Sequence, residues 1–353
     1  MSKAAICVVV PVYKAMATLD RCVESVLAQQ VEGGLTCILV DDGSPDESGA
    51  LCDAWGAKDD RVTVIHQDDL GVSGARNSGL AAADSEFIVF LDSDDALRPG
   101  ALQAALTAQR AAPQDFVVWH YTTDEKDPAA VTADAEPRTQ AGLARLWLDC
   151  LLAMPWNKLY RADLAKQLQF DVQYTLGEDL QFVLDYIALL GQTVPEFGYR
   201  VMTSPLTFYD CSRGGTLSTR YHANYCDIWP KHFAKLNAAC HAAACPAEDM
   251  RPLHRAELQV FAEGVADIMR RDPSPTQRLK GYKAEAALRS PWLRALLERM
   301  KIEHCYSAYY LPCRWRNVGL VCRVDEARRA NAPLYGKLDW AGYYLLLGRM
   351  RRD

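Results

Sequence analysis

The chain has 353 residues, half of them hydrophobic and 24% charged, which predicts a folded protein and excludes extensive disorder. Its net charge of −6 and the lack of a recognition motif argue against binding to nucleic acid. No apolar run approaches the roughly 18 residues that span a bilayer, and the N-terminus has no signal-peptide pattern, so we expect a cytoplasmic protein. The twelve cysteines form no CxxC pair and are expected to be reduced thiols.

Strand and helix patterns alternate through the first part of the chain. Apolar runs predict strands at residues 5–10, 35–40, 62–66 and 87–91. Helical spacing follows the first three strands, and we expect Pro11 to end the first strand and Thr18 to cap the first helix. Four strands that alternate with helices predict an α/β fold, with a mostly parallel sheet flanked by helices on both faces.

Acidic side chains follow the fourth strand directly. Residues two apart in an extended backbone face the same way, so Asp92 and Asp94 are expected to point at one place beyond the strand's carboxyl end. Ligands bind at that edge of open α/β sheets, and hard carboxylate oxygens suit Mg²⁺ or Mn²⁺. The alternative is that the four residues from Asp92 to Asp95 only form a turn and cap the next helix.

Other polar residues at the same edge fit a nucleotide. Asp41 is suited to accept hydrogen bonds from a base or a ribose, Tyr13 to stack on a base and Arg76 to neutralise phosphate. Each has an ordinary alternative, namely a turn, simple packing or a surface ion pair. The chain has neither GxGxxG nor GxxxxGK[ST], so we expect a divalent ion to handle the diphosphate.

The final third of the chain is mostly helical. Apolar residues recur at helical spacing over 234–244, 253–269 and 291–300. We therefore predict two domains, residues 1–220 and a helical region over 221–353. Residues 301–353 are aromatic and carry a net charge of +5, which favours contact with an anionic membrane surface. A solvated helical face or an oligomer contact is the alternative.

Six motifs in sequence resemble the inverting GT-A glycosyltransferases of family 2. The resemblance covers about residues 4–220. The six motifs read VVVPVYKA, VDDGSPDES, DLGVSGARNSGL, VFLDSDD, PWNKLY and LGEDLQF. One departure is Lys14, where the family often has Asn. The resemblance implies a GT-A fold, with a helical appendage in this chain, and a sugar-nucleotide donor, most often a UDP-sugar.

The resemblance also implies roles for individual residues. Asp179 would be the general base that takes the acceptor's hydroxyl proton, Asp94 the main metal ligand, and Asp92 a ligand of the metal or the ribose. The remaining donor-site residues are Pro11, Val12 and Tyr13 along the base, Asp41 on the base, Arg76 near the pocket, and Ser93.

Further residues are assigned to the acceptor side or to a closing loop. They are Trp156 and Lys158 of PWNKLY, Glu178 beside the base, Arg213 of a Gly-rich loop, and His222 as a further metal ligand. Each has a structural alternative: core packing for Trp156, a surface turn for Arg213, and a purely structural histidine. Glu178 and Asp179 also open a predicted helix, whose dipole is expected to lower the pKa of Asp179 and weaken it as a base.

The sequence thus predicts a metal-dependent inverting glycosyltransferase that acts in the synthesis of a bacterial surface glycan. The expected cofactor is Mn²⁺ or Mg²⁺, and the expected acceptor is a glycan or a polyprenyl-linked sugar, with peripheral membrane contact and a homo-oligomer as further possibilities. The alternatives are a nucleotidyltransferase that makes sugar nucleotides, and a binding module that has lost turnover. The first of these would normally show a Gly-rich basic loop after the first strand, and PVYKAMAT is not one.

Overall fold

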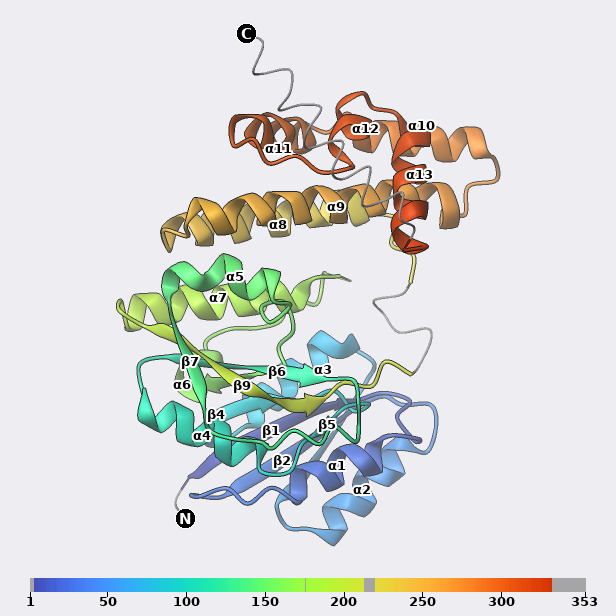
Figure 1. Ribbon diagram of the computed structural model, residues 1–353. Helices are drawn as coiled ribbons and strands as arrows, with labels where there is room; N and C mark the ends of the chain where they lie inside the picture. The colour runs from blue at the N-terminus through green and yellow to red at the C-terminus, as the bar shows by residue number, and fades with distance from the viewer. Residues whose placement is uncertain (1–2, 175, 213–219, 332–353) are drawn as a thin grey trace. The chain divides into compact units, whose positions relative to one another are not determined.

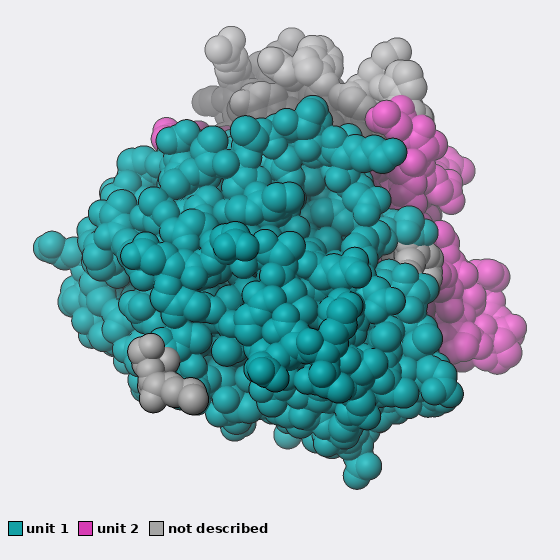
Figure 2. Space-filling view, turned by 90° about the horizontal axis from the view of Figure 1, so that it is seen from below, with its two compact units in different colours: residues 1–214 teal, residues 215–353 magenta. Residues whose placement is uncertain are grey.

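The computed structural model describes residues 3–174, 176–212 and 220–331 (Figure 1). The chain divides into two compact units, residues 1–214 and 215–353, which Figure 2 shows in different colours. The sequence predicted a boundary at residue 220. None of the described helices combines the length and the hydrophobicity that crossing a bilayer requires.

The first unit is built on a mixed sheet. Its elements are β1 (Ala4–Val12), α1 (Leu19–Leu27), β2 (Leu35–Asp42), α2 (Ser48–Lys58), β3 (Val62–Gln67), α3 (Gly71–Ala82), β4 (Ser85–Phe90), β5 (Ala96–Leu97), α4 (Ala101–Ala111), β6 (Phe116–Thr122), β7 (Ala135–Thr139), η1 (Gln140–Gly142), α5 (Leu143–Leu148), β8 (Lys158–Arg161), α6 (Ala162–Ala165), α7 (Glu178–Thr193) and β9 (Gly198–Phe208). The strand order is β3-β2-β1-β4-β8-β6-β9-β5, and β7 pairs with β9.

The four strands predicted first form the parallel half of this sheet. β1 pairs in parallel with β2 on one side and with β4 on the other, and β2 pairs in parallel with β3. The other half is less parallel than we predicted, because β8 runs antiparallel to both β4 and β6, and β5 and β7 run antiparallel to β9. The chain order reverses between β1 and β4, and the carboxyl ends at such a point form the usual ligand site of α/β sheets.

Helices cover both faces of the sheet, as the sequence predicted. Val8 and Val10 of β1 share a core with apolar residues of α1 and α4. On the other face Val9 lies against Gly79 of α3, and Phe90 packs its ring against Phe182 of α7, with ring centroids 5.8 Å apart. Both faces of β1 and β4 are therefore buried, which explains why these strands are continuously apolar.

Two details at the start of the chain differ from expectation. Pro11 does not end β1, because it is still paired with Val40 of β2. The Val9 carbonyl accepts from Leu91 N on the β4 side, so the Pro11 nitrogen, two residues on, also faces that side, and β4 has already ended there. A missing N–H therefore costs no ladder bond. Thr18 stands at the N-cap position of α1, but its side chain makes no capping bond.

The second unit is helical, as predicted. Its helices are α8 (Tyr225–Ala242), α9 (Ala247–Arg271), α10 (Gln277–Leu288), α11 (Pro291–Ile302), α12 (Tyr310–Arg314) and α13 (Val318–Arg329). α9 is the central helix, against which α8, α10, α11 and α13 pack. Phe261, Leu297 and Tyr309 are among the buried side chains of a core that belongs to this unit alone.

Candidate active site

A buried arginine joins two of the predicted site carboxylates. Arg76 lies on α3 with its side chain 3% exposed, and its Nη2 donates to Asp92 Oδ1 over 2.8 Å. Its Nη1 donates to Asp179 Oδ1 over 2.6 Å, at the first turn of α7. The guanidinium also lies over the ring of Phe170, 5.4 Å from its centroid. Three segments that are far apart in the chain therefore meet at one cation. The predicted base Asp179 thus lies close to the turn formed by Asp92–Asp95, which we call the DSDD turn.

The environment of Asp179 suits a general base near neutral pH. Burial raises the pKa of Asp179 to about 7; Arg76 opposes the rise, and the neighbouring carboxylates Glu178 and Asp92 add to it. Our expectation that the helix dipole would lower this pKa was therefore wrong. The dipole is worth about 1 kcal/mol or less at an exposed helix end, and removal of a carboxylate from water outweighs it.

The DSDD turn concentrates negative charge at the end of β4. Asp92, Ser93 and Asp94 are partly exposed, whereas Asp95 is fully buried. Asp95 Oδ1 accepts from the backbone N–H of Asp210 over 3.0 Å, and its Oδ2 has no hydrogen-bond partner among the described residues. Burial and the nearby charges of Asp92 and Asp94 raise the pKa of Asp95 to about 9.

These residues fit a divalent cation. The charges of Asp92 and Asp94 add to the effect of burial on the pKa of Asp95, and the partly exposed carboxylates of Asp92 and Asp94 supply hard oxygen ligands. Arg21 ties the turn to Asp210: its Nη2 donates to the Asp94 carbonyl and to Asp210 Oδ2, each over 2.6 Å. Arg21 thus fixes the backbone of the turn.

Asp41 lies at the same edge, at the end of β2. Burial alone would raise its pKa, but hydrogen bonds from Ser44 and from His66 at the end of β3 lower it. His66 Nδ1 lies 3.0 Å from Asp41 Oδ2, and its Nε2 lies 2.9 Å from Asp53 Oδ1. These two carboxylates, Asp53 first, raise the pKa of His66. Asp41 is therefore ionised and firmly placed, as a group that accepts hydrogen bonds from a nucleoside must be.

The first loop of the site follows β1. Pro11 and Val12 are paired with β2 and buried, whereas the Tyr13 ring is 44% exposed and available for stacking. Lys14 adopts a left-handed backbone conformation, with φ of 52°. That conformation costs about 1 kcal/mol for most residues and less for Asn, which explains the Asn that the resemblance leads one to expect here.

Two of the proposed acceptor-side residues are buried. Trp156 is 3% exposed and stacks on Tyr209, with centroids 5.4 Å apart. The Lys158 ammonium is fully buried and donates to the carbonyls of Leu151 and Met154 and to Asn157 Oδ1. Burial lowers the pKa of Lys158 well below its usual value. Lys158 therefore fixes the 151–157 loop, and direct contact with an acceptor would require that loop to move.

The other predicted residues are placed less tightly. Glu178 is partly exposed beside Asp179 at the start of α7. His222 belongs to the second unit and lies before α8, and its carbonyl accepts from Tyr225 N. Arg213 lies outside the described residues. The roles assigned to all three stay predictions.

Sequence reasoning missed four residues of this edge, namely Arg21, His66, Asp95 and Asp210. His66 follows an apolar strand directly, the same signal that pointed to Asp41 and Asp92, so it was open to prediction. Arg21 sits among ordinary helix residues, and its partner Asp210 is 189 positions away. No local pattern reports such a pair.

Comparison with known proteins shows which proteins this chain is similar to. The profile of glycosyl transferase family 2 matches residues 7–169. These residues belong to glycosyl transferase family 2. The resemblance seen in the motifs is confirmed over these residues. The matched residues, here called the family 2 domain, begin within β1, end after α6 and include the DSDD turn, whereas Asp179 lies beyond them.

Curated relatives are bacterial. The chain is 39% identical to glycosyltransferase GlyG of Streptococcus pneumoniae over 124 residues, which are 35% of this chain and 41% of GlyG. It is 31% identical to putative glycosyltransferase EpsH of Bacillus subtilis, over 49% of this chain and 52% of EpsH. It is also 31% identical to the succinoglycan biosynthesis protein ExoO of Rhizobium meliloti, over 54% of this chain and 58% of ExoO. The matches thus span about half the length of these relatives.

Solved structures share the fold of this chain beyond the family 2 domain. The crystal structure of S. aureus TarS 1-349 in complex with UDP-GlcNAc has a TM-score of 0.61 at 17% identity, and covers 93% of this chain and 92% of that one. The mannosyltransferase PcManGT of Pyrobaculum calidifontis, in complex with GDP-Man and Mn²⁺, has a TM-score of 0.50 at 16% identity and covers 90% and 87%. The GT-A fold expected from the motifs is confirmed.

Proposed function

We propose that this chain is an inverting glycosyltransferase that moves a sugar from a nucleotide-diphosphate donor to an acceptor hydroxyl. The observation that carries the proposal is the Arg76 bridge, in which the two terminal nitrogens of one guanidinium donate to Asp179 and to Asp92 of the DSDD turn. A donor-side carboxylate and a base of near-neutral pKa are thereby fixed relative to each other. Family membership supplies the reaction class.

The residues divide the chemistry between them. Asp41 accepts hydrogen bonds from the nucleoside, while Asp92 and Asp94 hold a divalent cation. When bound, that cation stabilises the negative charge that develops on the departing diphosphate. Asp179 takes the proton of the acceptor hydroxyl as its oxygen attacks the anomeric carbon from the face opposite the diphosphate, so the configuration inverts. Arg76 is a positioning residue, because it touches the two carboxylates.

A UDP-sugar is the proposed donor, and a bacterial surface glycan the proposed product. The similar TarS structure was solved with UDP-GlcNAc. The relatives include ExoO and, at 36% identity over 28% of this chain, the minor teichoic acid biosynthesis protein GgaA of Bacillus subtilis. Both are named for the synthesis of surface or secreted polysaccharides, which supports a glycan acceptor.

Donor binding should depend on Asp94 and on metal. The test measures the thermal unfolding midpoint, Tm, of the purified chain with each of a panel of nucleotide sugars, with and without Mn²⁺. A donor at 100 times its Kd stabilises the folded state by about 2.7 kcal/mol, so the correct one raises Tm markedly. In Asp94→Asn the part of this shift that requires Mn²⁺ should disappear. A full Mn²⁺-dependent shift in that variant, or sugar transfer at full rate in chelator, would contradict the metal role of Asp94.

We also propose that the basic segment 301–353 rests on an anionic membrane surface where lipid-linked acceptors are held. In its described part the Trp315 side chain is 63% exposed, between Arg314 and Arg316; residues 332–353 lie outside the described part. Full-length chain should sediment with vesicles that contain anionic lipid, and Trp315→Ala should reduce the bound fraction. Equal sedimentation with neutral vesicles would contradict the proposal.

A further inference from the structure

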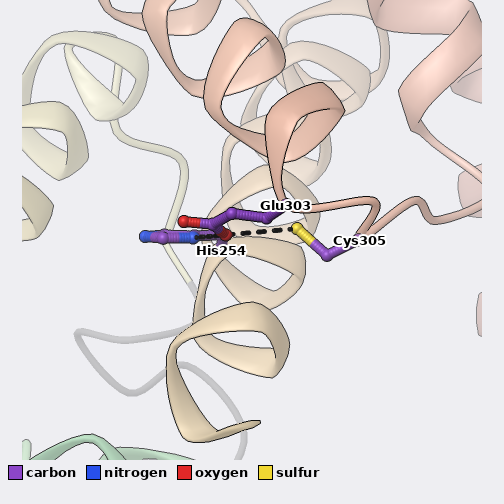
Figure 3. Close-up of side chains that lie close together, drawn as sticks. All are labelled: His254, Glu303 and Cys305. Carbon is purple, nitrogen blue, oxygen red and sulfur yellow. Dashed lines mark hydrogen bonds and ion pairs between the residues drawn. The ribbon is translucent and has the colours of Figure 1, made fainter. Parts of the chain in front are cut away.

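Three side chains with different donor atoms converge in the second unit (Figure 3). His254 comes from α9, Glu303 ends α11, and Cys305 follows two residues later. His254 Nδ1 lies 2.6 Å from Glu303 Oε2, and Cys305 Sγ lies 3.5 Å from the same oxygen. One nitrogen, one oxygen and one sulfur are thus within 4.8 Å of one another.

Burial distinguishes this cluster from a surface ion pair. His254 is 1% exposed and Cys305 4%, whereas the Glu303 side chain is 27% exposed and gives a route from solvent. Imidazole, thiolate and carboxylate together form the ligand set of Zn²⁺, and three protein ligands leave a fourth position open. Mg²⁺ and Mn²⁺ prefer oxygen ligands, so this cluster differs in kind from the DSDD turn.

The other side of the His254 ring gives an independent indication. Nε2 lies 3.2 Å from Asn237 Oδ1 on α8 and 3.3 Å from Arg299 Nη1. The orientation of the Asn237 amide is fixed, because its Nδ2 donates to Phe233 O and to Glu257 Oε1. Asn237 therefore presents an acceptor to Nε2, whereas the Arg299 guanidinium, which can only donate, would have to turn away when Nε2 carries the proton. A histidine that ligates a metal through one ring nitrogen usually donates the other N–H to such an acceptor.

We propose that His254, Glu303 and Cys305 bind Zn²⁺ through Nδ1, a carboxylate oxygen and Sγ, with a water molecule as the fourth ligand. On binding, the imidazole proton moves from Nδ1 to Nε2. The Nε2–H then donates a hydrogen bond to Asn237 Oδ1. The thiol proton leaves to solvent, so one proton is released per ion. The ion and its two anionic ligands are then neutral together, which suits a mostly buried site. The ion would fasten the 303–305 segment to α9.

The test uses the full chain, stripped with chelator and reloaded with Co²⁺, a spectroscopic substitute for Zn²⁺. We expect about one Co²⁺ per chain at this site, with a thiolate-to-cobalt charge-transfer band. Cys305→Ser should lose that band, while Cys322→Ser, which removes a partly exposed thiol of α13 in the same unit, should keep it. Zn²⁺ should displace Co²⁺ and abolish the band.

Two results would overturn the proposal. One is a folded wild-type chain that takes up Co²⁺ without a thiolate band. The other is a band that Cys305→Ser retains. If Cys305→Ser does not fold by circular dichroism, Glu303→Gln serves as the second variant, because its side chain is partly exposed; it should bind Co²⁺ at least tenfold more weakly, in line with the loss of a ligand. Unchanged affinity in Glu303→Gln would then decide against the site.

Discussion

Asp179→Asn is expected to lower kcat by about 10²–10⁴-fold, the usual contribution of a general base. The amide keeps the size of the carboxylate but cannot accept the acceptor's proton. Because Asp179 contacts Arg76 and not the DSDD turn itself, the Tm shift caused by donor and Mn²⁺ should persist. The measurement is release of nucleoside diphosphate at saturating donor and acceptor, beside that Tm shift.

Asp185→Asn is the matched control, because it neutralises another partly exposed carboxylate of α7 and should keep kcat within a few-fold. The wild-type pH profile gives a second check. Since the base must be ionised and its pKa is raised to about 7, kcat/KM should be constant above that pH and fall about tenfold per pH unit below it. Unchanged turnover in Asp179→Asn would assign the base to another residue.

Arg76→Met should destabilise the first unit by about 3 kcal/mol, at the lower end of the range for a broken buried ion pair. The guanidinium is buried, but Asp92 and Asp179 retain 28% and 29% exposure and so stay partly hydrated. Urea unfolding of the first unit measures the loss. Arg110→Met is the control: that guanidinium pairs with the exposed Glu32, and such surface pairs contribute about 1 kcal/mol or less.

The pH dependence separates the charge of Arg76 from its packing. Arg76 lowers the pKa of Asp179, so without it that pKa rises further. Above the wild-type pKa the variant must ionise an uncompensated carboxyl, so the destabilisation should grow as pH rises from about 6 to about 8. Arg76→Lys keeps the positive charge but loses the two-pronged guanidinium. Compared with Arg76→Met, it should recover part of the stability and shift the acid limb of the kcat/KM profile less. A loss independent of pH would show that only packing is involved.

One rule from the sequence placed three of the predicted site residues at one edge of the sheet, where the structure also has them. Acidic residues that directly follow buried strands identified Asp41, Asp92 and Asp94, because carboxyl ends of neighbouring parallel strands meet at one edge. The role of Arg76 was read differently, as a phosphate ligand, because its partner Asp179 is 103 positions away and tertiary contacts decide which carboxylates a cation reaches. The pKa of Asp179 also depended on burial, which a helix position does not reveal.

The antiparallel half of the sheet escaped prediction for a similar reason. The strand β8 lies within and just beyond the PWNKLY motif. Its direction follows from a pairing with both β4 and β6, which are separated from it by long segments. The burial of Lys158 depends on the same pairing, since its three acceptors come from the loop before β8.

Pro11 has an effect on the sheet that its place in β1 makes visible. The last ladder bond between β1 and β4 runs from Leu91 N to Val9 O, and the next donor on that side of β1 would be the N–H that proline lacks. β1 therefore has no N–H at Pro11 to donate to the chain beyond β4. An imino acid thus limits the ladder between β1 and β4 at the point where the acidic turn begins.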